Sequence, residues 1–159
     1  MIAAMRIAFL ALQAFQVTFL FLHDWVPLGR FTNLAAVRAA DPFQKRLWTT
    51  LLIGVPFAIG LAFSIIHADD FVFPFWLSTY LWVSYGLLLA GEIRAWWVPY
   101  LVWSDPDRTV RYRQRFAGTY RFLKDRAGIA PDTLHVILHT ATLATLVLLA
   151  FGVDVESLD

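Results

Sequence analysis

Residues 76–103 read WLSTYLWVSYGLLLAGEIRAWWVPYLVW, and this stretch decides the fold predicted for the chain. Its first part, 76–91, carries no charged residue. At about 1.5 Å of rise per residue, a helix of this length nearly crosses the ~30 Å core of a bilayer. Glu92 and Arg94 follow directly, and aromatic residues come next. The stretch therefore predicts a membrane span over about 76–97 that ends in charged and aromatic residues.

Three further apolar runs lie at about 3–22, 47–66 and 133–153. Hydrophobic residues make up 59% of the chain and charged residues 16%, whereas a soluble domain has about 25% charged residues. Helices that are apolar all round are typical of membrane spans, and the runs lack the alternation of strands. We interpret the first run as a retained span, because the nearest cleavage context of a signal peptide lies well beyond it. The sequence thus predicts an all-α fold, an integral membrane four-helix bundle that forms a single domain over 1–159.

Lysine and arginine are concentrated in two of the connections. Eleven of the thirteen lie in 23–46 and 104–132, whereas 67–75 and the C-terminal tail have none. The positive-inside rule then places both basic connections in the cytoplasm and both termini outside. The order E-I-R-A-W-W-V-P-Y, a basic segment and D-T-L-H-V-I-L-H resembles bacterial membrane proteins of unknown function, which implies a bacterial cytoplasmic membrane. In helix count alone the chain is also similar to sterol isomerases and the sigma-2 receptor, and no motif transfers a site residue.

The second basic connection predicts a helix between spans 3 and 4. Tyr112, Phe116, Tyr120 and Leu123 fall at helical spacing among basic residues. Such a stripe favours a basic interfacial helix lying among lipid headgroups, and a solvated basic helix is the alternative. The bilayer and its anionic lipid headgroups are therefore the expected partners, and nucleic acid is not expected. The residues predicted to face the lipid surface are Arg108, Arg111, Arg113, Arg115, Arg121 and Lys124.

Polar residues inside the spans recur on single helical faces. The three sets are Gln13, Gln16 and His23; Ser78, Tyr85 and Glu92; and His135, His139 and Thr142. We predict that these faces point into the bundle, because an unpaired charge in lipid costs ~2.5–3.5 kcal/mol. His23, Glu92, His135 and His139 are all predicted to lie toward the cytoplasmic side. Glu92 is expected to pair with His135, His139 or an arginine.

Three interpretations of this polar cluster remain open. His23, Glu92, His135 and His139 could bind a metal ion. Haem ligation by His135 and His139 together is disfavoured, because two ligands on one helical turn cannot approach opposite faces of its ring. Glu92, His135 and His139 could perform acid–base chemistry on a lipophilic substrate. The favoured interpretation is a structural network or a site for a small molecule or lipid, with Glu92 paired either internally or with Arg94 of a second copy in a homo-oligomer.

The absence of cysteine limits the chemistry available to the chain. The chain has no cysteine, which excludes disulfides and thiolate metal sites. No motif indicates a cofactor. The aromatic residues Trp96, Trp97, Tyr100 and Trp103 are interpreted as an interfacial belt.

Overall fold

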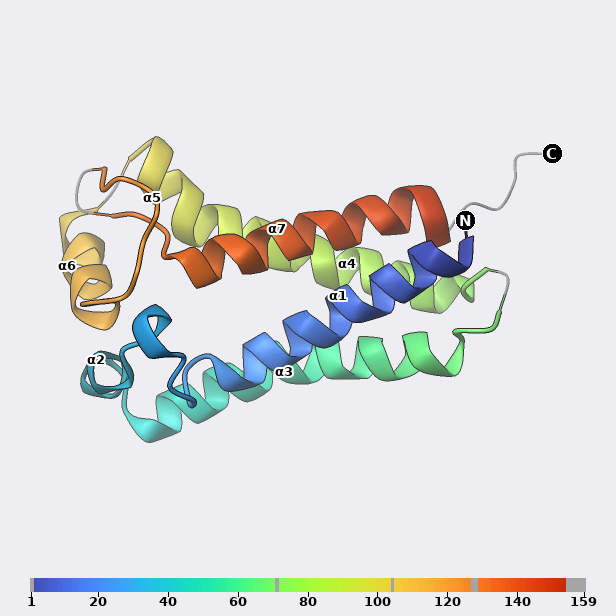
Figure 1. Ribbon diagram of the computed structural model, residues 1–159, viewed down its shortest axis with the longest axis horizontal. Coiled ribbons are helices and arrows are strands. Elements are labelled where there is room, and N and C mark those ends of the chain that lie inside the picture. Colours follow the sequence, from blue (N-terminus) through green and yellow to red (C-terminus); the bar gives the residue numbers. More distant parts are fainter. Residues whose placement is uncertain (1, 71, 104, 127–128, 154–159) are drawn as a thin grey trace.

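The computed structural model describes residues 2–70, 72–103, 105–126 and 129–153, and in these ranges it is helical without extended strands. Helices α1, α3, α4 and α7 run along the long axis in alternating directions, and α2, α5 and α6 gather at one end (Figure 1). The elements are α1 (Ile2–Leu22), η1 (Gly29–Phe31), α2 (Leu34–Ala40), α3 (Phe43–Ile66), α4 (Phe75–Glu92), η2 (Ile93–Trp97), α5 (Val98–Leu101), α6 (Pro106–Arg115), α7 (Thr133–Leu148) and η3 (Leu149–Val153).

Three of these helices are long and apolar enough to cross a membrane: Ala3–Leu22, Phe43–Ile66 and Thr133–Phe151. Helix α4 packs beside them, but its serines, tyrosines, glycines and Glu92 dilute its apolar character. Helix α3 begins before the predicted position 47, so Lys45 and Arg46 lie inside it. Beyond α4 the backbone continues as the short π-helix η2, which the sequence did not predict.

Small residues on α3 allow close helix packing. A Cβ atom built on Gly54 would lie 2.9 Å from the ring of Phe21, and one on Gly60 would lie 3.2 Å from Leu81. Both distances are too short for a larger side chain without movement of the neighbour. Neighbouring helices therefore approach α3 closely at these two glycines. The most buried apolar residues of the bundle are Phe9, Leu77, Leu81, Tyr85 and Leu149.

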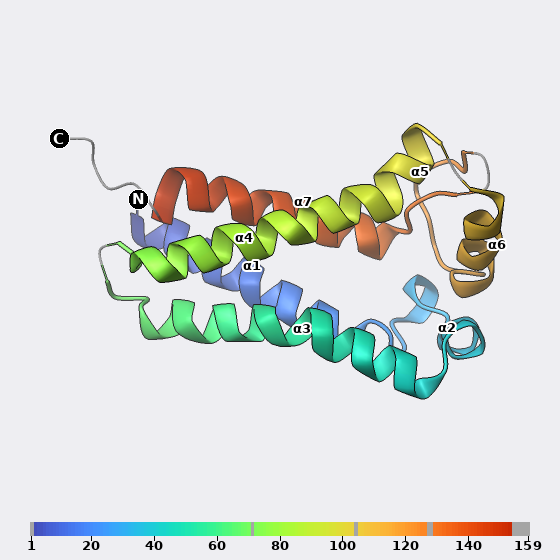
Figure 2. The same ribbon diagram turned by 180° about the vertical axis from the view of Figure 1, so that it is seen from behind.

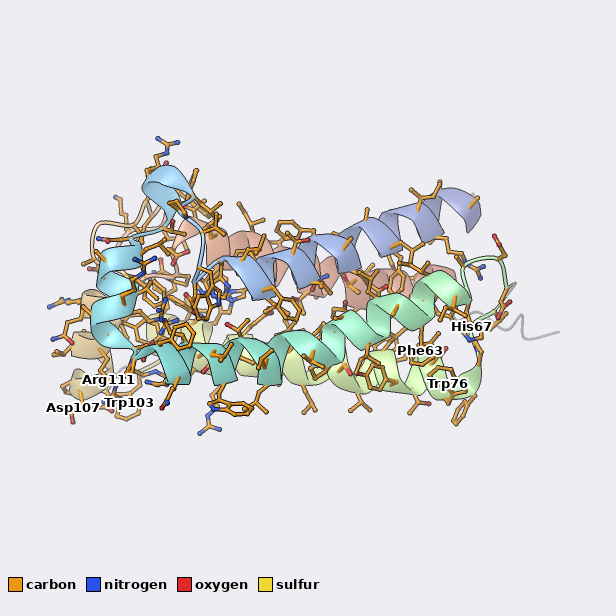
Figure 3. All side chains as sticks on the ribbon, turned by 90° about the horizontal axis from the view of Figure 1, so that it is seen from below. Phe63, His67, Trp76, Trp103, Asp107 and Arg111 are labelled. Carbon is orange, nitrogen blue, oxygen red and sulfur yellow. The ribbon has the colours of Figure 1, made fainter. Side chains whose placement is uncertain are left out.

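Helices α3 and α4 meet near their connection and diverge toward the α2/α6 end, the end of the molecule formed by α2 and α6 (Figure 2). Near the connection, the Tyr80 hydroxyl donates a hydrogen bond of 2.7 Å to the Pro56 carbonyl. One turn further on, Phe57 packs edge-on against Tyr85. Figure 3 shows His67 at the connection end and Asp107 and Arg111 at the α2/α6 end, with polar side chains gathered mainly at these two ends.

The basic helix between α5 and α7 is shorter than predicted. Helix α6 ends at Arg115, and Gly118, with φ of +74°, turns the chain away. Tyr120 and Leu123 are therefore not on the helix, and the prediction of one long apolar stripe was wrong. Phe116 is buried and packs against Trp96, so the apolar face of this region contacts the protein itself.

The α2/α6 end is held by hydrogen bonds between distant loops. The Asn33 side chain caps α2 by accepting a hydrogen bond from Ala36 N, and it also donates 2.8 Å to the Ala117 carbonyl. Tyr120 N donates to Arg30 O at 2.8 Å. Helix α2 and the segment after α6 are therefore fixed against each other, and together they cover one end of the bundle.

Candidate functional site

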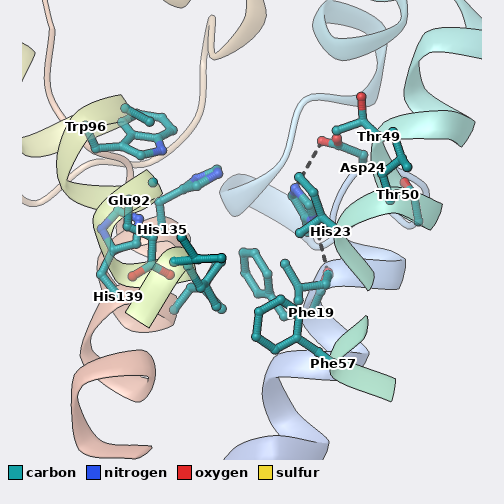
Figure 4. Close-up of a pocket in the computed structure, with 18 of the residues that line it drawn as sticks. Phe19, His23, Asp24, Thr49, Thr50, Phe57, Glu92, Trp96, His135 and His139 are labelled. Atoms are coloured by element: carbon teal, nitrogen blue, oxygen red, sulfur yellow. Dashed lines mark hydrogen bonds and ion pairs between the residues drawn. The ribbon is translucent and has the colours of Figure 1, made fainter. Parts of the chain in front are cut away.

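A cavity of about 730 Å³ lies where α3 and α4 diverge. Its size falls within the range of small-molecule sites in proteins, about 300–1,000 Å³. One wall comes from α4 and α7 and carries Glu92, His135 and His139, and the facing wall comes from α1 and α3 and carries Phe19 and His23 (Figure 4). The apolar part of the lining includes Leu20, Leu52, Ile53, Phe57, Leu87, Leu88 and Leu138, and the polar part lies toward the α2/α6 end.

An ion cluster closes the polar end of the cavity. The Arg115 guanidinium binds the carboxylates of both Asp24, at 2.6 Å, and Asp41. Lys45 adds a second cation to Asp41 at 2.6 Å. The side chains of Asp24 and Asp41 are only 7% and 8% exposed. Because buried carboxylates need a paired cation, Arg115 holds α6 against the end of α1 and the start of α3.

His135 stands at the centre of the polar end. Its ring lies 4.3 Å from that of Trp96 and 5.8 Å from that of His23 on the opposite wall, measured between centroids. Phe116 closes a third side at 5.3 Å. The sequence placed His135 in a polar cluster, and the structure adds this aromatic enclosure.

Asp132 orients His135. As the N-cap of α7, Asp132 accepts a hydrogen bond of 3.0 Å from His135 N, and its second oxygen lies 2.9 Å from Nδ1 of the same ring. Burial disfavours the charge of Asp132, but the charge and hydrogen bonds of His135 outweigh it, so the pKa of Asp132 lies below its ordinary 3.8. The carboxylate can only accept, which places a hydrogen on His135 Nδ1.

The opposite ring nitrogen, Nε2, is consequently a hydrogen-bond acceptor when His135 is neutral. Within the described ranges it makes no hydrogen bond to protein, and the His135 side chain lines the cavity while remaining 14% exposed. His23 shows the same pattern. Its Nδ1 donates to the Phe19 carbonyl at 2.9 Å, and its Nε2 lies 3.5 Å from Asp24 Oδ1. The polar end therefore offers several acceptors to the cavity.

Glu92 belongs to a second network, deeper in the bundle. Its Oε1 lies 2.9 Å from the Thr142 hydroxyl, which also lies 3.1 Å from Gln16 Oε1. Gln16 in turn donates 2.8 Å to Thr145. The prediction that Glu92 faces the interior is confirmed, since the residue is 6% exposed, but the predicted partner was wrong. Thr142 lies one helical turn beyond His139 and reaches Glu92 first.

His139 is positioned differently from His135. The indole N–H of Trp97 donates 3.1 Å to His139 Nδ1, which leaves the hydrogen of the neutral ring on Nε2. His139 Nε2 and Glu92 Oε2 are both buried and have no partner among the described residues. The predicted trio of Glu92, His135 and His139 thus lines one wall, but only His135 has an accessible free ring nitrogen.

The predicted metal set is not assembled. In the part of the chain that the structure describes, no group of three or more histidine, aspartate and glutamate side chains is arranged to hold a metal ion. His23 lies on the facing wall, with its ring centroid 5.8 Å from that of His135, while His139 Nδ1 accepts from Trp97 and its Nε2 is buried. Glu92 bonds to Thr142 and does not join them.

The six basic residues predicted at the lipid surface fall into two groups. Arg115 is held in the ion cluster, Arg108 donates to the Ala95 carbonyl at 3.2 Å, and Arg121 donates to the Phe116 carbonyl at 3.0 Å. The side chains of Arg111, Arg113 and Lys124 are exposed. The arginines of the first group therefore hold the α2/α6 end together.

The aromatic belt predicted from the sequence divides in the same way. Trp103 is 70% exposed, as a belt residue would be. Trp96 is 6% exposed and lies against the rings of Tyr112, Phe116 and His135. Trp96 is a core residue of the α2/α6 end, and its interpretation as part of the belt was wrong.

Sequence reasoning missed Asp24, Asp41 and Asp132 as site residues. One signal could have identified Asp132. It directly precedes α7 and lies three residues before His135, the spacing at which an N-cap side chain reaches the N–H of the third helical residue. No comparable signal pairs Asp24 or Asp41 with Arg115, because the partners come from segments far apart in the sequence.

We predict that Asp132→Ala lowers the free energy of unfolding by about 0.5–2 kcal/mol, the usual effect of losing a helix cap. Asp132→Asn keeps an acceptor for His135 N and should cost less. Because the folded-state pKa lies below 3.8, the stabilisation by the charge is complete above this value and is lost as the pH falls through the folded-state pKa. The free energies of unfolding of wild type and Asp132→Asn, measured in detergent from about pH 6 to about pH 3, should converge as the pH falls. A constant difference would contradict this account.

Comparison with protein-family models, with curated proteins and with solved structures finds no match for this chain. No function therefore reaches the chain through a relative, and the helix-count similarity to sterol isomerases and the sigma-2 receptor gains no support.

Proposed function

We propose that this chain is a four-span membrane protein that binds an amphipathic, lipid-soluble small molecule in the cavity between α3 and α4. The observation that carries the proposal is the form of the cavity, whose apolar walls lead to a polar end with His23, Asp24 and His135. A molecule with a hydrophobic body and one polar group matches this arrangement. A solely structural network, such as Glu92 with Thr142 and Gln16, has no need of so large a cavity.

The ligand would reach the cavity sideways, from the hydrocarbon of the bilayer. The lining includes Leu52 and Leu87, which are 73% and 69% exposed on the outer surfaces of α3 and α4. The opening is thus bordered by apolar side chains on both sides. A water-soluble ligand would gain nothing from such a border, whereas a molecule dissolved in lipid can cross it without leaving an apolar medium.

Helix α4 is the proposed fourth span. It runs beside the three long apolar helices, and its polar residues Ser78, Tyr85 and Glu92 are buried in the bundle. With Arg30, Arg38 and the basic residues of 104–132 at one end, the positive-inside rule supports cytoplasmic α2 and α6 and external termini in a bacterial cytoplasmic membrane. Reporter fusions after Asp70 and after α7 should report the external side, and a cytoplasmic signal from either would overturn this orientation.

Anionic lipid headgroups are the partner proposed for the exposed cations at the α2/α6 end. Arg111, Arg113 and Lys124 are the members of the predicted basic set with exposed side chains, and each would contribute about 1 kcal/mol near an anionic surface. Annular lipid exchange in nanodiscs should favour phosphatidylglycerol over phosphatidylcholine. The preference should fall when all three are changed to glutamine, and an unchanged preference would exclude these residues.

Cavity binding is tested by filling the cavity. A photoreactive farnesol analogue should label the purified protein, and farnesol should compete. Leu88→Trp, which places an indole in the cavity lining, should reduce labelling about tenfold, or ~1.4 kcal/mol. Leu143→Trp is the matched control, because Leu143 is 53% exposed on α7 and outside the lining. Circular dichroism checks that both variants fold. Equal labelling of the two variants would refute the proposal.

A membrane-embedded enzyme using acid–base chemistry on a lipophilic substrate is the second candidate. The Asp132–His135 pair favours it, because an oriented imidazole with an accessible nitrogen is the arrangement of a general base. On this reading His135→Phe abolishes turnover of a bound substrate while the substrate still binds. Retention of turnover by His135→Phe would exclude His135 as the base.

A further inference from the structure

The geometry points to a hydroxyl group as the polar head of the ligand, bound through its hydrogen to His135 Nε2. This inference rests on the proposed function, since it names the chemical class that the proposed cavity recognises. It begins from two bonds already described. Asp132 takes the Nδ1 hydrogen of His135 at 2.9 Å, so a neutral His135 presents a lone pair at Nε2.

On the facing wall, His23 and Asp24 also present hydrogen-bond acceptors. His23 donates from Nδ1 to the Phe19 carbonyl, so its Nε2 is likewise an acceptor when the ring is neutral. Asp24 Oδ1, 3.5 Å away, can only accept. The two imidazole rings approach edge-on with centroids 5.8 Å apart. A group placed between these two rings meets an acceptor nitrogen on each side, so a hydrogen-bond donor suits this position.

The charge balance excludes two other heads. An acid would compete with Asp24 and Asp41 for Arg115 and Lys45, the cations that already pair with these two buried carboxylates. An ammonium would find these two carboxylates already neutralised by Arg115 and Lys45, and it would face the Arg115 guanidinium across the same end of the cavity. A neutral donor avoids both costs, and a hydroxyl is the simplest group that a lipid-soluble molecule carries.

Asp132 is a positioning residue in this scheme, and its role gives a specific test. In Asp132→Asn, the amide oxygen can still accept from His135 N while the amide nitrogen donates to Nδ1. That change forces the hydrogen of the ring onto Nε2, which becomes a donor. An ether oxygen and a hydroxyl oxygen can both accept from Nε2–H, so the protein should stop distinguishing them.

The experiment measures binding of farnesol, its methyl ether and farnesylamine to the purified full-length protein by competition with the photoreactive analogue. Wild type should bind farnesol about tenfold more tightly than the ether or the amine, the ratio that ~1.4 kcal/mol produces. Asp132→Asn should reduce the farnesol-to-ether ratio to about one. His135→Phe, which keeps a ring against Trp96 and Phe116, should do the same by lowering farnesol binding alone.

A matched control lies at the other end of the molecule. His67 and Asp70 form a second histidine–aspartate pair three residues apart, with Nδ1 2.6 Å from the carboxylate, and neither residue lines the cavity. Asp70→Asn should leave the ratio unchanged. The ¹⁵N spectrum of labelled histidine gives an independent readout, because farnesol should shift the Nε2 signal that disappears in His135→Phe.

The outcomes separate this inference from the proposed function. If wild type binds farnesol and its ether equally, and Leu88→Trp still blocks both, recognition of a hydroxyl head is contradicted while binding in the cavity is supported. Tighter binding of farnesylamine overturns it in favour of a cationic head. Absence of binding by all three probes overturns the proposed function itself.

Discussion

Arg115→Met should lower the free energy of unfolding by about 3 kcal/mol, the lower end of the range for breaking a buried ion pair. The lower end applies because the Arg115 side chain is 25% exposed and water screens part of the interaction. Its loss leaves Asp24 without its cation, and Asp41 keeps only Lys45. Unfolding in mixed detergent–SDS micelles, followed by circular dichroism, measures the change.

Two comparisons identify the cause. Arg113→Met removes an exposed arginine from the same helix and should change stability by no more than about 0.5 kcal/mol. Adding Asp24→Asn and Asp41→Asn to Arg115→Met should restore much of the loss, because no uncompensated carboxylate remains. If the triple variant is as unstable as Arg115→Met alone, packing of the arginine stem and not charge is responsible.

The same cluster shows where sequence reasoning stops. Helical periodicity predicted which faces are buried: Gln13 and Gln16 are fully buried, and Ser78, Tyr85 and Glu92 share one interior face. This prediction succeeds because a helix fixes the direction of each side chain once its register is known. Asp24 and Arg115 meet only because α2 and α6 fold over the same end of the bundle, and no local pattern in the sequence encodes that approach.

Polar residues at helix termini are intermediate in how well the sequence predicts their contacts. The cap made by Asn33 is a local feature, since its side chain reaches only three residues along its own helix. Asp132 follows the same local geometry, yet its effect on His135 matters for the site because Trp96 and Phe116 enclose the ring from other elements. The cap is therefore predictable from local sequence, whereas the direction in which the capped histidine faces depends on tertiary packing.

The sequence predicts the ends of a helix well only where a physical requirement fixes the length of that helix. The apolar runs set the extents of α1 and α7 closely, because hydrocarbon thickness requires about 20 residues. No such requirement acts on the connection after α5, where a stripe of aromatic residues at helical spacing continued past the real end of α6. Gly118, with φ of +74°, ends that regularity, and Phe116 then turns inward.

Trp96→Ala should be the most destabilising single truncation at the α2/α6 end, at about 3–5 kcal/mol. Trp96 is 6% exposed and its ring lies 4.3–4.9 Å from those of His135, Tyr112 and Phe116, so removing it leaves a void that joins the cavity. His135 would also lose the ring that fixes its position against the facing wall. Unfolding in detergent gives the stability, and farnesol competition should show weaker binding in the same variant.

Trp103→Ala provides the contrast, because Trp103 belongs to the same cluster in the sequence but is 70% exposed. A side chain that anchors only at an interface stabilises the fold little in detergent, so this variant should stay within about 0.5 kcal/mol of wild type and bind farnesol normally. Equal effects of the two truncations would support the original interpretation of Trp96 as a residue of the interfacial belt. A large loss confined to Trp96 would instead show that one tryptophan connects η2 to both α6 and α7, and that the position of His135 depends on this contact.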